Sequence, residues 1–197
     1  MRKNMLFLII IIVLLASSCS RYEELNNLSI ISNIEIKYQD KKYVVIMQEV
    51  TPKKNDNNLS YVYTYRTGRS KNLKKAFDNI IDHSPKKIYL KKVQNIVIQN
   101  SNKDVIISEY LKNYKYFSIL NSDSSIIISD NSLKKIMKIN NDYRYIESIL
   151  KNKKISYKEV LKKYKKNKRN KLPLLNINNN ELEFKKYIYL HVYSSAS

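Results

Sequence analysis

The sequence predicts an α/β (α+β) fold, in which helices pack on a mixed β-sheet that follows a cleaved signal peptide. Three observations support this prediction. Residues 1–20 have the order of an export signal. Apolar residues then alternate in three segments, which is the two-residue period of β-strands. From residue 73 onward, helical periodicity and short apolar runs take turns, which is typical of strands connected by helices.

The first segment, MRKNMLFLIIIIVLLASSCS, reads as a secretory signal peptide. Arg2 and Lys3 give it a positive start, an apolar run follows at 5–15, and small residues precede Cys19. The apolar run has about half of the roughly 20 residues that a membrane-spanning helix needs. The segment ASSC at 16–19 resembles the lipobox of bacterial lipoproteins, although alanine stands where leucine is more usual.

This interpretation makes Cys19 the site of lipid attachment. Its thiolate would attack a lipid donor, cleavage would follow Ser18, and Cys19 would then carry the acyl chains. No other cysteine exists in the chain to pair with it. The alternatives are an ordinary cleavable signal with an incidental cysteine, or an uncleaved anchor.

Three strands are expected first, at 28–38, around 43–47 and around 61–65. Each is marked by alternating apolar residues, which are Ile34, Ile36 and Tyr38, then Tyr43, Val45 and Met47, and then Tyr61, Tyr63 and Tyr65. The polar residues Gln39–Lys42 separate the first two strands as a hairpin turn. Pro52 and the polar stretch behind it end the second strand.

A helix is expected from residue 73, because apolar residues recur there at helical spacing. They are Leu73, Ala76, Phe77, Ile80 and Ile81. Gly68, the only glycine, lies in the TGRS segment before this helix, and Ser70 is the expected N-cap. Pro85 ends the helix, and residues 87–99 then predict a strand.

The rest of the chain continues this alternation. Helices are expected at 104–114, after Asn131, at 145–151 and behind a capping box at 156–159, and the apolar run 126–128 predicts a buried strand. Pro173 is expected to begin a linker, and 181–193 to form a terminal strand. The predicted organisation is a signal peptide at 1–18, a lipidated tether at 19–27, an α/β domain at 28–170, and a linker with the start of a truncated second domain at 171–197.

A formal net charge of +20 is the most unusual feature of the composition. Of 37 basic residues only six are arginine, and the chain is also rich in Asn, Ile and Tyr. Because these residues and lysine have A/T-rich codons, genome composition explains much of the charge. Arginine makes most bidentate base contacts, and an exported protein rarely meets nucleic acid, so no nucleic-acid partner is expected. A lysine-rich surface is instead attracted to an anionic membrane.

Two segments are candidates for contact with a partner or with the membrane. The run 151–171 has eleven basic residues and one acidic residue, and its candidate contacts are Lys162, Lys163, Lys165 and Lys166. Such a run is usually a solvated helix face, and its functional interpretation is a contact with lipid head groups or an acidic partner. The second candidate is an alternating aromatic stripe, which is either ordinary strand packing or a stacking surface, formed by Tyr61, Tyr63 and Tyr65.

The sequence shows no constellation of catalytic or metal-binding groups. His83 and His191 are far apart and lack the spacing of metal ligands, and His83 sits near a helix end, where it would complement the helix dipole. A chain with one glycine has no glycine-rich phosphate loop. The protein is therefore expected not to be an enzyme, with no catalytic residue, no metal and no cofactor other than the lipid on Cys19.

Six segments, taken in order, are similar to the Ger(x)C family, the C-subunit lipoproteins of spore germinant receptors. They are YEELNNLSIISNIEIKY, KKYVVIMQEVTPKK, TGRSKNLKKAFDNI, SPKKIYLKKVQNIVIQN, ISEYLKNYKYF and SSIIISDNSLKKIM. The resemblance runs from about Cys19 to Met137, and more loosely to the end of the chain. The individual motifs are short, so the resemblance rests on their common order.

The sequence also departs from the family pattern. The departures are Ser20-Arg21 in place of Trp-Asp, Ile34-Glu35-Ile36 in place of a Gly-Ile-Asp turn, Lys92 in place of a strand histidine, and Asn113-Tyr114 in place of an Arg-Asp pair. Most members are also longer, with two further domains behind the first. The chain thus resembles a shortened and divergent copy of the family's N-terminal domain.

The resemblance implies a lipid-anchored, non-catalytic subunit of a germinant receptor, which contributes to germination from the outer face of the cytoplasmic (spore inner) membrane. Its partners would be the lipid bilayer and two integral membrane subunits of the same complex, one of them similar to transporters. The alternative is a small solute-binding lipoprotein, or another envelope lipoprotein unrelated to germination. A ligand cleft between two lobes would favour solute binding.

Overall fold

The computed structural model describes residues 27–55, 58–140, 142 and 144–190. The predicted signal peptide, the cleavage and lipid-attachment site at Ser18 and Cys19, and His191 lie outside the described residues. None of the helices in the described part of the chain is long and apolar enough to cross a membrane.

The described residues form eight strands and five α-helices, with three short 3₁₀-helices. The strands are β1 (Leu28–Gln39), β2 (Lys42–Asn55), β3 (Asn58–Ser70), β4 (Lys87–Tyr89), β5 (Asn95–Gln99), β6 (Ser125–Ser129), β7 (Asn170–Asn178) and β8 (Glu181–Leu190). The helices are α2 (Leu73–Asp82), α3 (Lys103–Lys112), α4 (Leu133–Ile139), α5 (Tyr145–Leu150) and α6 (Tyr157–Lys165). The 3₁₀-helices are η2 (Asn100–Asn102), η3 (Tyr116–Ile119) and η4 (Lys151–Lys153).

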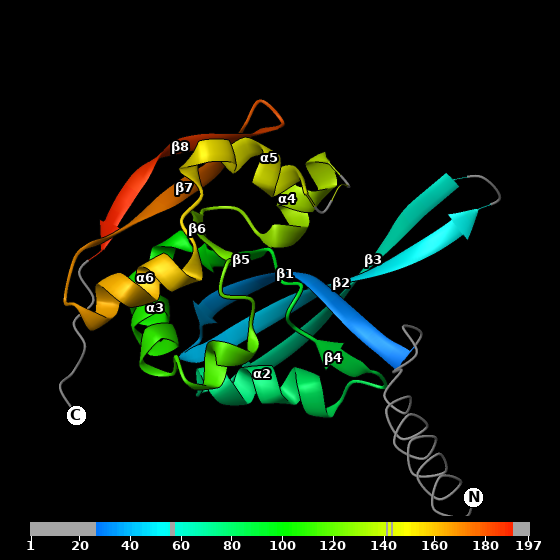
Figure 1. Cartoon of the computed structure of the whole chain (residues 1–197), viewed down its shortest axis with the longest axis horizontal. Coiled ribbons are helices and arrows are strands. Elements are labelled where there is room, and N and C mark those ends of the chain that lie inside the picture. Colours follow the sequence, from blue (N-terminus) through cyan, green and yellow to red (C-terminus); the bar gives the residue numbers. More distant parts are fainter. Residues whose placement is uncertain (1–26, 56–57, 141, 143, 191–197) are drawn as a thin grey trace, which may run out of the picture.

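One mixed sheet runs through the middle of the molecule (Figure 1). Its strand order is β3-β2-β1-β5-β6-β7-β8, and β4 pairs with the start of β1 beside this path. The central strands β1, β5, β6 and β7 are parallel to one another, whereas β2, β3 and β8 pair antiparallel to their neighbours. The predicted mixed sheet with helices packed on it is therefore confirmed.

Helices cover both faces of this sheet. On one face, α2, α3 and α6 bury their apolar residues in the larger core, where the ring of Phe117 lies 4.4 Å from that of Tyr110 and 4.9 Å from that of Phe77. On the other face, α4 and α5 form a second core with Val97 and Ile127 of the sheet. The strands β5 and β6 are buried on both faces, which explains why they read as continuous apolar runs.

Two hairpins turn over two residues without glycine. Asp40 and Lys41 have φ angles of 51° and 58°, and Asn179 and Asn180 have 45° and 62°. Such turns need left-handed backbone at both central positions, which Asn and Asp adopt more readily than other non-glycine residues. The predicted hairpin turn at Gln39–Lys42 is confirmed.

Side-chain caps mark the starts of α2, α4 and α6. In α6 the predicted capping box is present: the Glu159 N–H donates to Ser156 Oγ over 3.3 Å, and the Ser156 N–H donates to Glu159 Oε2 over 3.1 Å. The prediction of Ser70 as the cap of α2 is wrong. Asn72 is the cap, with Oδ1 3.1 Å from the N–H of Lys75, because β3 continues through Ser70.

Residues 87–99 form two strands rather than the single predicted strand. β4 pairs with the first residues of β1, whereas β5 pairs with β1 from Asn33 onward. Leu90 and Val93 are buried between the two strands, and the Val93 N–H donates to the Leu90 carbonyl in a tight turn over 3.2 Å. The turn between β4 and β5 also carries buried apolar residues, so the apolar pattern is not interrupted and the two strands look like one in the sequence. In the structure, β4 and β5 pair with different parts of β1.

Pro173 lies inside β7 and does not begin a linker, so that prediction is wrong. It stands opposite Tyr187 of β8, whereas the parallel pairing of β7 with β6 covers only Leu174 and Leu175. A proline is tolerated in a strand where no neighbour needs its missing N–H, and Pro173 lies outside the two residue pairs that join β7 to β6. The segment 170–190 therefore extends the sheet of the domain.

Gly68 is required by close packing of β3 on α2. A β-carbon at this position would lie 2.0 Å from the carbonyl oxygen of Ala76 and 2.8 Å from Cγ1 of Ile80. The backbone of the helix blocks the space, so no side-chain movement relieves the clash. The only glycine of the chain thus sets how closely the helix approaches the sheet.

We expect Gly68→Ala to lower the free energy of unfolding by about 3 kcal/mol, because the clash forces α2 away from β3. Urea unfolding followed by circular dichroism measures this loss. The matched control is Thr67→Ala at the exposed neighbouring position, which should cost less than about 1 kcal/mol. Equal losses for the two variants would contradict the close-packing explanation.

Candidate functional site

The predicted tyrosine stripe lies on one face of the edge strand β3. Tyr61, Tyr63 and Tyr65 stand opposite Pro52, Val50 and Gln48 of β2. Their alternation places them on the same side, toward α4, and Tyr61 is 36 % exposed. The three side chains therefore share one face of β3, with Tyr61 exposed and Tyr63 and Tyr65 half-buried.

A groove of about 560 Å³ runs between this stripe and α4. Its lining residues are Tyr61, Val62, Tyr63, Tyr65, Lys134, Met137 and Lys138, which we call the tyrosine groove. The ammonium of Lys134 lies 5.1 Å from the ring centre of Tyr65, within the range of a cation–π contact. Aromatic rings, a methionine and lysines give this groove the composition of a protein contact surface with a positive rim.

A second cavity opens where β1 separates from the β2–β3 ribbon. Pairing of β1 with β2 stops at Ile31 and Glu49, whereas β2 and β3 remain paired up to Asn55 and Asn58. The ribbon therefore projects beyond the sheet (Figure 1). The cavity in this fork has a volume of about 450 Å³, and its lining residues are Ile30, Ser32, Val50, Pro52, Tyr61, Lys92 and Gln94.

Buried amides connect the three strands below the fork. Asn33 Nδ2 donates to Gln48 Oε1 over 2.6 Å, and Ser32 Oγ donates to the same oxygen over 3.0 Å. Gln48 Nε2 in turn donates to the hydroxyl of Tyr65 over 3.3 Å. Since Asn33 and Gln48 are fully buried, their hydrogen bonds replace water and fix the relative positions of the strands.

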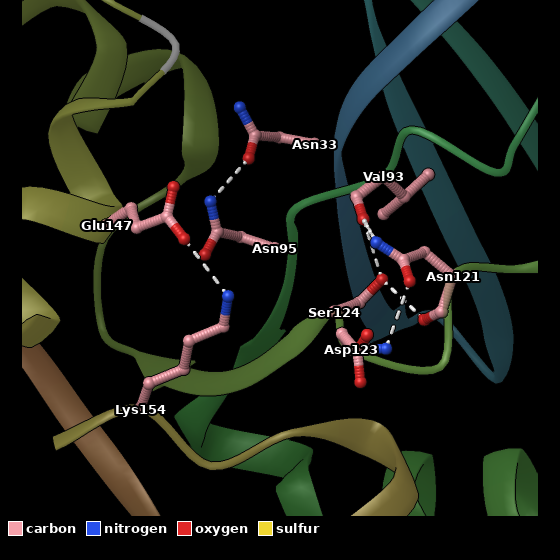
Figure 2. A network of polar contacts seen from close by, with 8 residues as sticks. All are labelled: Asn33, Val93, Asn95, Asn121, Asp123, Ser124, Glu147 and Lys154. Atoms are coloured by element: carbon pink, nitrogen blue, oxygen red, sulfur yellow. Dashed lines mark hydrogen bonds and ion pairs between the residues drawn. The ribbon is translucent and has the colours of Figure 1, made fainter. Parts of the chain in front are cut away.

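The network continues into the parallel part of the sheet (Figure 2). Asn95 Nδ2 donates to Asn33 Oδ1 over 2.8 Å. Beside it, Ser124 Oγ donates to the carbonyl of Val93 over 2.7 Å, and Asn121 Nδ2 reaches the same oxygen over 3.3 Å. These contacts hold the starts of β5 and β6 in place.

A buried carboxylate supports the other wall of the tyrosine groove. Glu35 lies on the α4 side of β1, with a side chain that is 2 % exposed and 3.0 Å from the ammonium of Lys37. Burial raises the pKa of Glu35, while Lys37 and the backbone N–H of Leu133 act in the opposite direction. This carboxylate faces the N-terminal end of α4, where the helix dipole favours negative charge. Its contacts point to a structural role at the base of α4.

The predicted basic run lies at the other end of the sheet from the tyrosine stripe (Figure 1). Lys162, Lys165 and Lys166 are exposed on and after α6, and Lys163 is half-buried. The ammonium of Lys165 lies 4.4 Å from the ring centre of Tyr114. The two candidate contact segments therefore belong to separate surfaces.

Several residues of the site were not predicted from the sequence. Lys134 and Lys138 are one helical turn apart, opposite the buried face of α4, and this spacing was the available signal. Lys92 and Gln48 carried no signal, because their roles depend on which strands become neighbours. Within the described residues, no group of three or more His, Cys, Asp or Glu side chains is placed to hold a metal ion.

Replacing Gln48, whose side-chain amide is at the centre of this network, should destabilise the domain. We expect Gln48→Ala to lower the free energy of unfolding by about 2 kcal/mol, because it removes the side-chain oxygen that accepts hydrogen bonds from the buried Asn33 Nδ2 and Ser32 Oγ. The matched control is Gln39→Ala at the exposed end of β1, which should change it by less than about 0.5 kcal/mol. Urea unfolding of both variants measures the difference, and equal values would show that the network does not stabilise the fork.

The comparisons with known proteins bear on the domain as a whole. The sequence profile of a family described as "Spore germination protein N-terminal domain" matches residues 21–173, which is more than half of the chain. Neither the curated proteins nor the solved structures that were searched contain a match. The matched range covers β1 to the start of β7, including every residue that lines the tyrosine groove and the fork cavity. The chain belongs to the family of spore germination proteins that share this N-terminal domain.

Proposed function

We propose that the protein is the lipid-anchored, non-catalytic C subunit of a spore germinant receptor, or a shortened relative of one. The observation that carries the proposal is the family domain at 21–173, which begins two residues after Cys19 of a lipobox-like segment. Acyl chains on Cys19 would hold the domain on the outer face of the spore inner membrane. Stable anchoring needs two lipid signals, which the doubly acylated cysteine of a lipoprotein would supply.

We propose that the subunit acts by being held close to its membrane partners. Cys19 lies eight residues before Asn27, where the described domain begins, so an extended tether reaches about 28 Å at most. A domain on so short a tether meets neighbouring membrane proteins at a high effective concentration. Weak contacts are then sufficient to keep it in a complex with two integral membrane subunits.

The tyrosine groove is the proposed contact with these subunits. Val62 is 45 % exposed and Tyr61 36 %, and both lie on a ribbon that projects from the sheet. Tyrosine and methionine are enriched where proteins bind each other, because they bury much apolar area and still tolerate water at the rim. The lysines of α4 add a positive side that favours an acidic segment.

Solute binding is a second candidate, which the fork cavity favours. Its volume of about 450 Å³ lies in the range of small-molecule sites, and Lys92 and Gln94 place polar groups at an otherwise apolar wall. The described residues form one continuous sheet and not two lobes around a cleft. We therefore rank solute binding behind the subunit role.

Deletion of the gene in its source organism is expected to abolish or slow germination with at least one nutrient. Restoring the wild-type gene should restore the response, whereas Cys19→Ala should not, because the domain is no longer held at the membrane. Loss of optical density of purified spores after addition of nutrients measures germination. Lys168→Ala, at an exposed position, is the control variant.

Two results would contradict this proposal. One is a deletion strain that germinates normally with every nutrient that triggers the wild type. The other is full activity of a Cys19→Ala protein that is no longer in the membrane fraction. Spores that germinate normally, together with binding of a small solute by the purified protein, would favour the second candidate.

Crosslinking tests the proposed subunit contact. A photoreactive benzophenone amino acid at Tyr63 is expected to form an adduct with an integral membrane subunit in intact spore membranes, because this position lines the tyrosine groove. The same amino acid at exposed Lys166 should form none. Immunoblots and mass spectrometry of the adducts measure the result. An adduct at Lys166 alone would assign the contact to the basic run instead.

A further inference from the structure

Basic residues flank β4 on both sides in the sequence. Lys86 comes directly before this strand, and Lys91 and Lys92 follow it after one buried leucine. All three lysines are exposed, and Tyr89 at the end of the strand is 36 % exposed. We call Lys86, Tyr89, Lys91 and Lys92 the β4 patch. No acidic residue occurs in the sequence between Asp82 and Asp104, so the segment 83–103 that contains the patch carries no negative charge.

Strand pairing places the β4 patch beside the start of the domain. β4 runs parallel to the first residues of β1, with Lys87 next to Leu28 and Tyr89 next to Ile30. In Figure 1 the start of β1 and β4 share the right-hand side of the molecule, and α6 lies on the left. The chain therefore enters the domain next to the β4 patch.

The side chains of β4 separate into an inner and an outer set. Ile88 packs against the larger core, while its neighbours Lys87 and Tyr89 point to the other side of the strand. The ammonium of Lys91 donates to the Ser118 carbonyl over 3.1 Å, which keeps this lysine near the surface. Lys92 lines the open fork next to Tyr61. The outer set is thus basic and aromatic, with an apolar residue anchoring the strand beneath it.

We propose that the β4 patch contacts the headgroups of anionic phospholipids and orients the domain on the membrane. This inference rests on the proposed lipid anchor at Cys19, whose tether holds the start of β1 within about 28 Å of the bilayer. Lysines close to an anionic surface are attracted to it, and tyrosine favours the headgroup region. The β4 patch offers flexible ammonium groups on a strand and its flanking turns, which suits a fluid surface of negative charge better than a shaped acidic protein.

Site-specific quenching tests the proposal with the full, processed protein in vesicles. The vesicles contain about 30 mol % phosphatidylglycerol and a lipid with a nitroxide on its headgroup. A cysteine at exposed Pro85, next to the patch, carries a fluorescent maleimide, and a cysteine at exposed Lys168 carries it in the control. We expect the probe at 85 to be quenched at least about twice as strongly as the probe at 168, with the contrast falling in about 0.5 M salt.

A charge variant identifies the residues responsible. We expect the double variant Lys86→Gln/Lys92→Gln to reduce the ratio of domains that touch the membrane to domains that do not, by about fivefold for each lysine removed. Quenching of the probe at 85 should then fall close to that of the probe at 168. Lys165→Gln with Lys166→Gln removes the same charge from α6 and should leave the contrast unchanged. Circular dichroism shows that each variant is folded.

The outcomes separate this proposal from the anchor on which it rests. The wild-type protein has a single cysteine, Cys19. If Cys19 takes up the maleimide label, its thiol carries no lipid, and that result overturns the anchor. Anchored protein with equal quenching at 85 and 168 overturns the β4 patch alone. Stronger quenching at 168 would place α6 on the membrane, and quenching at 85 that needs a co-reconstituted protein would make the patch a protein contact. Each of these last two results also contradicts the proposal.

Discussion

The bulge at Ser32 is the constraint on which the rest of the structure depends. β1 pairs with β2 on both sides of this residue, but the register shifts by one between Ile31 and Asn33. A bulge bends its strand and increases the local twist, so β1 and the β2–β3 ribbon diverge beyond it. The freed start of β1 becomes the partner of β4, and the ribbon projects with Tyr61 exposed. One extra residue thus produces the fork, the groove and the β4 patch.

A fork of this kind leaves backbone and side-chain polar groups without strand partners, and the buried amides replace them. Gln48 accepts from Asn33 and Ser32 with one oxygen and donates to Tyr65 with its nitrogen, so both ends of its amide are used. The Gln94 N–H also donates to the Ser32 carbonyl over 2.7 Å, which ties the bulge to the turn before β5. A buried hydrogen-bonded network of this kind favours one arrangement of strands over others, since any slip would leave more polar groups unpaired.

The sequence predicted elements well where the physical cause is local. Alternation revealed the first three strands, and the capping box marked the start of α6, because both depend on neighbours along the chain. Predictions were wrong where the cause is distant. Pro173 looked like the start of a linker, but it lies inside β7, paired with Tyr187 of β8 and outside the two residue pairs that join β7 to β6. Asn33 and Asn95 lie inside segments predicted as strands, and only the pairing of β1 with β5 shows that their buried amides bond to each other.

The position of a lysine in the fold, rather than the net charge of the chain, likewise determines whether it contacts a membrane. The 37 basic residues are spread along the whole chain, so composition does not identify a contact. At physiological ionic strength an exposed charge acts over about 8 Å, and only lysines near the membrane then contribute to binding. α6 packs on β7, three strand spacings or about 14 Å from β1, whereas β4 is hydrogen-bonded to β1 itself. For a domain held by a tether before β1, strand order places the lysines beside β4 nearer to the point of attachment than those of α6.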